Sequence, residues 1–263
     1  CGRRPRLLAQ NVADYSWSND STRIAYSDVA GEPLLESTYI VTLEGVVQRV
    51  VQNLQRPVWF RGDARLAGVR TREGAFPILA TVDITGENLR ESNTPAAIVR
   101  LSPNGRYAAT QFLSSTASGV TASVFVYDFT TGAQVMLPGF DIVESPNTQH
   151  DYSVLGGWSP DSTRLVYSTL TSMNGRGEIR IASPQGNILQ AFERNFYAQP
   201  DWGPMNDWII YTLSEQPGTS VLSSPSPKNI YVRNIRTNQE IRITSLGDNH
   251  SPNWNGILCP ACR

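Results

Sequence analysis

Histidines and cysteines, the side chains that most often carry nucleophilic or metal chemistry, are scarce in this sequence. Its 263 residues include two histidines, His150 and His250, and three cysteines. A catalytic triad or a three-histidine zinc site needs more such groups, and the sequence contains no GxSxG, P-loop or dinucleotide motif. Nothing in the spacing brings an acidic pair such as Glu32 and Glu36 together for acid–base work. We therefore predict no catalytic residues, no cofactor and no metal site.

The cysteines lie at the two ends of the chain. Cys259 and Cys262 form a single CxxC, which supplies too few ligands for a zinc site and lacks the histidine of a haem-attachment motif. In an exported protein this pair is expected to form a local disulfide, with free thiols or a metal as alternatives. Cys1 opens the sequence as the acylated cysteine opens a processed bacterial lipoprotein. We expect lipidation at Cys1, and a fragment that starts at a cysteine is the alternative.

Composition and charge narrow the class of protein. A formal net charge of -1 and a pI near 6.2 provide no long-range field that would attract phosphates, so we expect no nucleic-acid partner. Hydrophobic residues make up 40% and charged residues 17%, with 20 glycines and 17 prolines, which is typical of a globular, turn-rich chain. No apolar run approaches the roughly 18 residues that a membrane-spanning helix needs.

An internal repeat is the most informative feature of the sequence. The segment WSNDSTRIAY begins at Trp17 and returns as WSPDSTRLVY at Trp158. Weaker or truncated copies begin at Trp59, Leu101, Trp202 and Trp254. The six starts lie roughly 40 to 57 residues apart, the range in which each repeat forms one small antiparallel sheet of a β-propeller.

Each copy predicts four short strands in the same order. The first strand ends at the tryptophan, and a turn such as Asp20-Ser21 leads into an apolar second strand, as at residues 23–26 and 164–167. Third strands are predicted at residues 38–41, 123–127, 178–181 and 229–232, and short fourth strands at residues 48–51, 135–137, 188–190 and 240–243. Residues tolerant of positive φ separate the third and fourth strands: Gly45, Gly86, Gly132, Gly186 and Asn238.

The sequence therefore predicts an all-β fold, a β-propeller of four-stranded antiparallel blades. We expect six blade positions, five complete and one shared by the two termini, with residues 6–10 as an outermost strand. Residues 1–5 would form an anchor, residues 6–256 the propeller and residues 257–263 a CxxC tail. The repeated tryptophans are expected to pack one blade on the next, and an aromatic cage for a ligand is the alternative.

The motif carried by WSNDSTRIAY, LSPNGRYAA and WSPDSTRLVY resembles the repeat of the TolB-like, Tol-system β-propellers and their WD-like relatives. The resemblance covers nearly the whole chain and implies a propeller. The same repeat builds the propeller domains attached to serine peptidases; the 263 residues include neither a hydrolase domain of that kind nor the α/β domain that precedes the Tol propeller. By analogy alone, the resemblance implies binding of envelope proteins.

We accordingly expect a non-enzymatic scaffold: a membrane-anchored lipoprotein or envelope-complex subunit, exported to the periplasm or cell surface. Its partners would be other envelope or membrane proteins, with the membrane reached through a lipid on Cys1. A glycan- or small-ligand-binding propeller and, less favoured, a propeller hydrolase are the alternatives. Two long loops break the regular repeat, and long loops are often functional. The predicted partner-binding residues in them are Phe140, Ile142, Val143, His150, Tyr152, Val221 and Leu222.

Overall fold

The computed structural model describes residues 6–29, 36–116, 119–139, 152–170, 177–194, 199–214 and 228–245. Over these residues the chain forms twenty β-strands and no helix. The strands are β1 Val12–Trp17, β2 Arg23–Asp28, β3 Ser37–Thr42, β4 Val47–Gln52, β5 Gln55–Trp59, β6 Arg65–Arg70, β7 Ile78–Asp83, β8 Arg90–Pro95, β9 Ile98–Leu101, β10 Tyr107–Thr116, β11 Gly119–Asp128, β12 Gln134–Met136, β13 Tyr152–Trp158, β14 Leu165–Leu170, β15 Gly177–Ala182, β16 Ile188–Arg194, β17 Pro200–Trp202, β18 Trp208–Ser214, β19 Lys228–Asn234 and β20 Glu240–Arg242.

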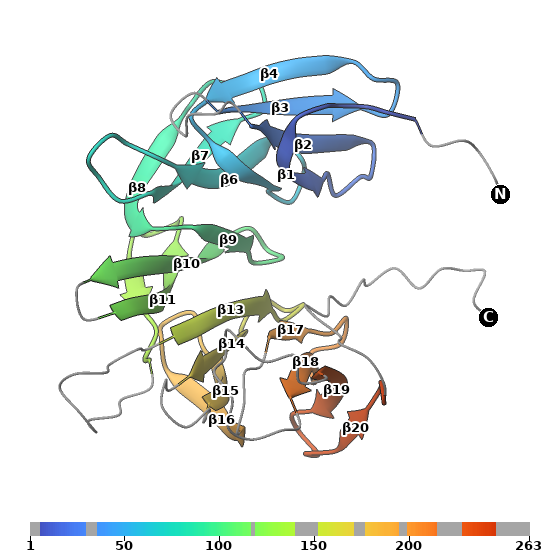
Figure 1. Ribbon diagram of the computed structural model, residues 1–263, viewed down its shortest axis with the longest axis vertical. Helices are drawn as coiled ribbons and strands as arrows, with labels where there is room; N and C mark the ends of the chain where they lie inside the picture. Colours follow the sequence, from blue (N-terminus) through green and yellow to red (C-terminus); the bar gives the residue numbers. More distant parts are fainter. Residues whose placement is uncertain are drawn as a thin grey trace. The chain divides into compact units, whose positions relative to one another are not determined.

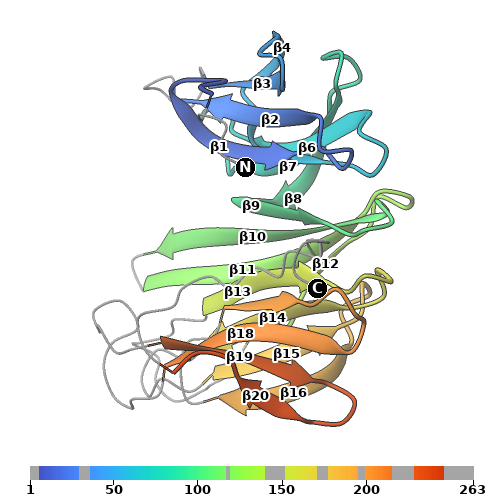
Figure 2. The ribbon, with the colours of Figure 1, turned by 90° about the vertical axis from the view of Figure 1, so that its right-hand side faces the viewer.

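Successive strands pair antiparallel and form five four-stranded sheets, β1–β4, β5–β8, β9–β12, β13–β16 and β17–β20. A parallel bridge between Ala122 and Tyr152 joins the third and fourth sheets. The chain divides into two compact units, Cys1–Leu101 and Ser102–Arg263. Figure 1 shows β13, β14, β15 and β16 in sequence order in the fourth sheet, and Figure 2 shows the long β10–β11 hairpin of the second unit. The part of the chain that the structure describes contains no helix able to cross a membrane.

The predicted turns have the predicted backbone. Ser21 follows the first tryptophan motif with φ +59°, and Ser18 Oγ donates to Asp20 Oδ1 over 2.6 Å. Asp20 Oδ1 in turn accepts the Thr22 backbone N–H over 3.0 Å, so the side chain closes the turn locally. Between third and fourth strands, all five predicted positions have positive φ, which confirms that prediction: Gly45, Gly86, Gly132, Gly186 and Asn238.

Apolar clusters lie between consecutive sheets and account for the core of each unit. Between the first two sheets the buried residues are Ala25, Ile40, Val50, Leu54, Trp59, Leu66, Ala80 and Val82. Between the third and fourth they are Tyr107, Ala109, Val124, Val126, Leu137, Trp158, Leu165, Tyr167 and Ala182. Between the fourth and fifth they are Val166, Ile179, Ile181, Trp202, Ile209, Tyr211 and Ile235. Each sheet therefore has an apolar face that it could not bury alone and that the neighbouring sheet covers.

In the first unit, Trp59 shows how a repeat tryptophan connects two sheets. Trp59 is 7% exposed, and its indole Nε1 donates to the Ser16 carbonyl of the preceding sheet over 3.1 Å. The Arg23 guanidinium lies 5.0 Å from the Trp59 ring, a cation–π contact from the same neighbouring sheet. The predicted packing role of the tryptophan is confirmed here.

The second unit repeats this arrangement with different side chains. Trp158 is 7% exposed and stacks on Tyr107 with ring centroids 5.8 Å apart. Trp202 is 4% exposed and lies 5.1 Å beneath the Arg164 guanidinium. Arg23, Tyr107 and Arg164 all stand six residues after the start of their own motif. The planar side chain at that position thus covers the tryptophan that begins the motif of the next sheet: Trp59, Trp158 or Trp202.

Two expectations at the first sheet are not met. Residues 6–10 form no strand; instead the Arg6 guanidinium donates to the Leu43 carbonyl over 3.3 Å and to the Glu44 carbonyl, contacts that fix the segment through its side chain. Trp17 is 50% exposed, whereas packing between blades predicted burial like that of Trp59. No described sheet precedes the first one in the chain, which leaves this tryptophan without the cover that Trp59 has. Trp254, the predicted start of the sixth blade, lies outside the described residues.

Candidate functional site

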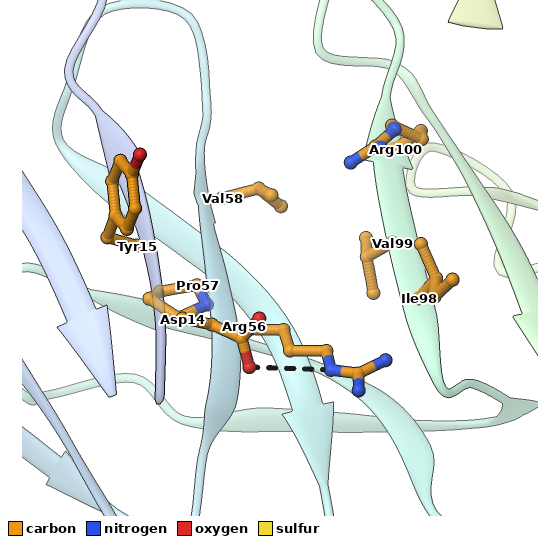
Figure 3. A pocket seen from close by; sticks show the side chains of 8 residues that line it. All are labelled: Asp14, Tyr15, Arg56, Pro57, Val58, Ile98, Val99 and Arg100. Carbon is orange, nitrogen blue, oxygen red and sulfur yellow. Dashed lines mark ion pairs between the residues drawn. The ribbon is translucent and has the colours of Figure 1, made fainter. Parts of the chain in front are cut away.

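A pocket of about 220 Å³ lies on the first strands β1, β5 and β9 of the first unit (Figure 3). It is lined by Asp14, Tyr15, Arg56, Pro57, Val58, Ile98, Val99 and Arg100. The pocket thus combines three charged side chains and a phenol with four apolar ones. Ligand sites typically have this composition, an apolar lining with a few polar groups that fix orientation.

Strand irregularities shape this pocket. The β5–β6 register shifts between Gln55 and Val58, where Pro57 has no N–H to give to the ladder. The β1–β2 register shifts between Val12 and Asp14. A shift also occurs in β13, so the bulge belongs to the repeat. What is particular to the pocket is the pair of charged residues, Asp14 and Arg56, that the bulges in β1 and β5 carry.

Arg56 has a backbone that its residue type rarely adopts. Its φ is +51°, and the other non-glycine residues with positive φ in the described part of the chain are Asn, Ser or Asp. Surrounding contacts hold Arg56 there: Nη1 donates to the Ala97 carbonyl over 2.6 Å, and Nε lies 3.5 Å from Asp14 Oδ2. Strained residues of this kind cluster at binding sites, because only a well-determined surrounding retains them.

Charge is distributed unevenly along the pocket. Glu36 interacts with both Asp14 and Arg56, and burial, together with the nearby carboxylates of Asp28 and Asp14, raises the pKa of Glu36. The carboxyl groups of Asp14 and Glu36 therefore both lie near Arg56. Figure 3 shows the Arg100 side chain at the opposite end, with apolar side chains between the two arginines: Val58, Ile98 and Val99.

Exposed aromatic and aliphatic side chains accompany the pocket. Tyr15 and Trp17 alternate along β1 and so share one face of the first sheet, and both are well exposed. The exposed large apolar residues on or next to this sheet are Leu7, Val12, Tyr15, Trp17, Val29, Leu43, Val46 and Val47. Of these, Tyr15 lines the pocket itself and Trp17 stands on the same strand.

Most residues predicted from the sequence to form a site lie outside the described residues. These are Cys1, Phe140, Ile142, Val143, His150, Val221, Leu222, Cys259 and Cys262. Tyr152 lies in β13, with its backbone paired opposite Leu170. In the described part of the chain no group of three or more His, Cys, Asp or Glu side chains is placed to hold a metal ion.

Sequence reasoning missed the pocket, although the repeat contained a signal for it. Asp14 and Arg56 each stand three residues before the tryptophan of their motif. Aligning the copies would have placed an acid and a base at equivalent positions of neighbouring first strands. Arg100, one residue before Leu101, has no such partner in the repeat, and only the structure brings it to the same cavity.

No protein-family model matches the sequence, and no curated protein matches it. Solved structures do match. TolB from Acinetobacter baumannii superposes with a TM-score of 0.56 at 15% identity, over 90% of this chain and 55% of that one. A protein assigned as TolB from Agrobacterium tumefaciens gives 0.55 at 13%, over 92% and 84%. The β-propeller domain of Cps50 (Swd1) from Myceliophteria thermophila gives 0.60 at 12%, over 91% and 73%.

These similarities establish the class of the fold: the chain has a TolB-like, WD-like β-propeller fold. It spans just over half the length of the Acinetobacter TolB, 55%. Enzymes are also among the similar structures, since an acylaminoacyl peptidase matches at a TM-score of 0.52 and the tricorn protease at 0.56. This chain covers 34% of the first and 25% of the second, so it corresponds to a part of each. The fold alone therefore does not separate binding from catalysis.

Proposed function

We propose that this chain is a non-enzymatic propeller that binds other proteins of the cell envelope. It has six blade positions, of which the sixth begins at Trp254. The similarity to TolB proteins supports export to the periplasm or cell surface. Lipidation of Cys1 would anchor the chain to a membrane, and a disulfide between Cys259 and Cys262 fits an exported protein.

The pocket on β1, β5 and β9 carries this proposal. Its volume of about 220 Å³ is below the roughly 300–1,000 Å³ of cavities that enclose whole small molecules. One or two side chains of a partner protein fill such a space. Tyrosine and arginine are the residue types that dominate binding energy at protein interfaces, and Tyr15, Arg56 and Arg100 surround the cavity. A small-ligand-binding propeller is the second candidate, because the same cavity has an ion pair at one end.

The two long loops are a second proposed contact with the same partner. They contain residues 140–153 and 214–228, and most of each loop lies outside the described residues. Their apolar residues would add contact area with the partner. The pocket, whose geometry is defined, is the contact to test first.

Photo-crosslinking from the pocket tests the proposal. A photoreactive phenylalanine replaces Tyr15 in the full chain, and in a control it replaces Leu189, an exposed apolar residue of β16. In cells that make the protein naturally, we expect a discrete protein adduct from position 15 that is absent from position 189. Filling the cavity with Val58→Trp should remove the adduct. Equal adducts from both positions, or none from position 15, would refute protein binding at the pocket.

A further inference from the structure

We propose that the pocket on β1, β5 and β9 holds an aliphatic side chain of the partner protein (Leu, Ile, Val or Met) rather than a charged one. The inference rests on the proposed function, because it names the chemistry of the segment that enters the pocket. Three observations support it. The charged side chains at the pocket already have partners within the chain, the walls are aliphatic, and a contact of Arg56 connects the strands that carry those walls.

The charged residues of the pocket are engaged with other groups of this chain. Asp14 Oδ2 lies 3.5 Å from Arg56 Nε, and Arg56 Nη1 donates to the Ala97 carbonyl over 2.6 Å. Arg100 also has an interaction within the chain. A charged partner residue would therefore meet groups of both signs, compete with these contacts and lose its own hydration on entering. Electrostatics thus gives the pocket little preference for a charged occupant.

The walls between these charges are aliphatic. Pro57, Val58, Ile98 and Val99 line the cavity, and Figure 3 shows the last three between the two arginines. Val58 and Ile98 are half-buried, so each keeps apolar surface exposed. Water at such walls finds few hydrogen-bonding groups, and an apolar side chain that displaces it gains affinity. Covering this surface is therefore the largest contribution that the pocket makes to binding.

The arginines and Tyr15 extend the apolar surface. Arg56 and Arg100 are both exposed, and an arginine packs its methylene groups against apolar neighbours while its guanidinium stays in water. Tyr15, also exposed, adds an aromatic ring to the lining. We therefore expect Arg100 to contribute to binding through its stem and not through its charge.

Arg56 holds the walls in place. Its backbone keeps a φ of +51°, and its bond to the Ala97 carbonyl connects β5, which carries Val58, to the residue directly before β9, which carries Ile98 and Val99. Arg56 is thus a positioning residue, which fixes the two aliphatic walls relative to each other.

Selection of peptides tests the inference without knowledge of the partner. A phage-displayed dodecapeptide library is selected on the immobilised full chain and, in parallel, on Val58→Trp, which fills the cavity. Ile98→Trp on β9 is a second filled variant, and unfolding curves confirm which variants fold. Peptides recovered from the wild type alone depend on the pocket. We expect them to share a Leu, Ile, Val or Met and to share no charged residue.

Fluorescence anisotropy then compares such a peptide with an analogue in which a polar residue of similar size replaces the aliphatic one. Loss of the apolar contact should weaken binding to the wild type roughly 10-fold to 100-fold. Val58→Thr, which keeps the branched shape and adds a hydroxyl to the wall, should also weaken binding, whereas Val47→Thr on exposed β4 should not. Arg100→Met, which keeps an unbranched stem without the charge, should bind within about 3-fold of the wild type. Raising the salt concentration from about 0.05 M to about 0.5 M should change the affinity equally little.

Pocket-dependent peptides that share an acidic or a basic residue would overturn the inference, and so would a steep loss of affinity with salt or on Arg100→Met. The proposed function would survive these results, because the peptides would still bind at the pocket. Recovery of the same peptides from the wild type and from the filled variants would overturn the proposed function as well. N-acetylleucine amide binding as tightly as the peptide would replace the partner protein by a small-molecule ligand.

Discussion

Asp63 joins the first two sheets more strongly than any equivalent residue joins the others. It is buried in the turn after β5, and its carboxylate accepts three hydrogen bonds from the first sheet. The donors are the Asn19 backbone N–H at 2.8 Å, the Asn19 side-chain amide at 2.6 Å and the Asp20 backbone N–H at 3.0 Å. In the second unit each pair of neighbouring sheets has only one corresponding bond. Between the third and fourth sheets the Asn104 backbone N–H donates to Ser162 Oγ over 2.9 Å, and between the fourth and fifth the Asp161 backbone N–H donates to Asn206 Oδ1 over 3.0 Å.

Asp63→Ala should therefore cost much more stability than Ser162→Ala or Asn206→Ala. Bonds to a charged acceptor are worth about 1.5–3 kcal/mol each, but water replaces part of this because the donors are only partly buried, so the three together amount to about 3 kcal/mol. The positive φ of Asp63, +55°, is also less favourable for alanine than for aspartate. Each single neutral bond in the second unit is worth about 1 kcal/mol. Asp63→Asn, which keeps one acceptor oxygen, should lie between the two.

Urea unfolding followed by tryptophan fluorescence gives the free energies, and native-state hydrogen exchange localises the effect. Asp63→Ala should speed exchange of the Asn19 and Asp20 amides selectively, while amides of the second unit keep their protection. If Asp63→Ala costs no more than Ser162→Ala, or if exchange rises equally in both units, the carboxylate is not the main polar contact between the first two sheets.

Three further predictions concern packing, turns and pH. Trp59→Phe should lower the free energy of unfolding by about 1 kcal/mol more than Trp202→Phe, because Trp59 Nε1 bonds to Ser16 whereas the buried Trp202 Nε1 has no partner among the described residues; urea unfolding of both variants checks this. Gly186→Ala should lower Tm more than Gly62→Ala: both have φ +89°, but a Cβ at Gly186 would meet Val135 Cγ1 at 2.6 Å and one at Gly62 would meet nothing within 4 Å. Hydrogen bonds from Ser18 and Thr22 lower the pKa of Asp20 to about 2 in the folded chain, so its contribution should be complete above about pH 4 and disappear as pH falls towards 2; an acid-unfolding curve of Asp20→Asn should lack that component.

The sequence specified the repeat but not every surface that the repeat creates. Trp17 and Trp158 stand in nearly identical motifs, yet one is half exposed and the other buried, because a neighbouring sheet covers only Trp158. Local turn chemistry was predictable for the opposite reason. Gly45 and Asn238 take positive φ from their own residue types and their place between two strands, without any distant contact.

The pocket lay beyond sequence reasoning because it depends on three strands at once. Arg56 and Arg100 are 44 positions apart in the chain, and neither belongs to a recognised motif. Both line one pocket because β5 and β9 are the first strands of consecutive sheets. Aligning the repeats shows Asp14 and Arg56 at equivalent positions before successive tryptophans. It does not show the bulges in β1 and β5 at these residues, which appear only in the strand registers.

The most direct test of the account measures the affinity of the protein crosslinked from position 15 for chains whose pocket is open or filled. Calorimetry compares the wild type, Val58→Trp in the pocket and Leu189→Trp on β16, with unfolding curves confirming that all three fold. Closing a pocket that holds a dominant contact should weaken binding at least about 30-fold, as loss of roughly 2 kcal/mol does, while Leu189→Trp changes it little. Equal affinity of Val58→Trp and the wild type would contradict the claim that this propeller binds its partner through the pocket on its first strands.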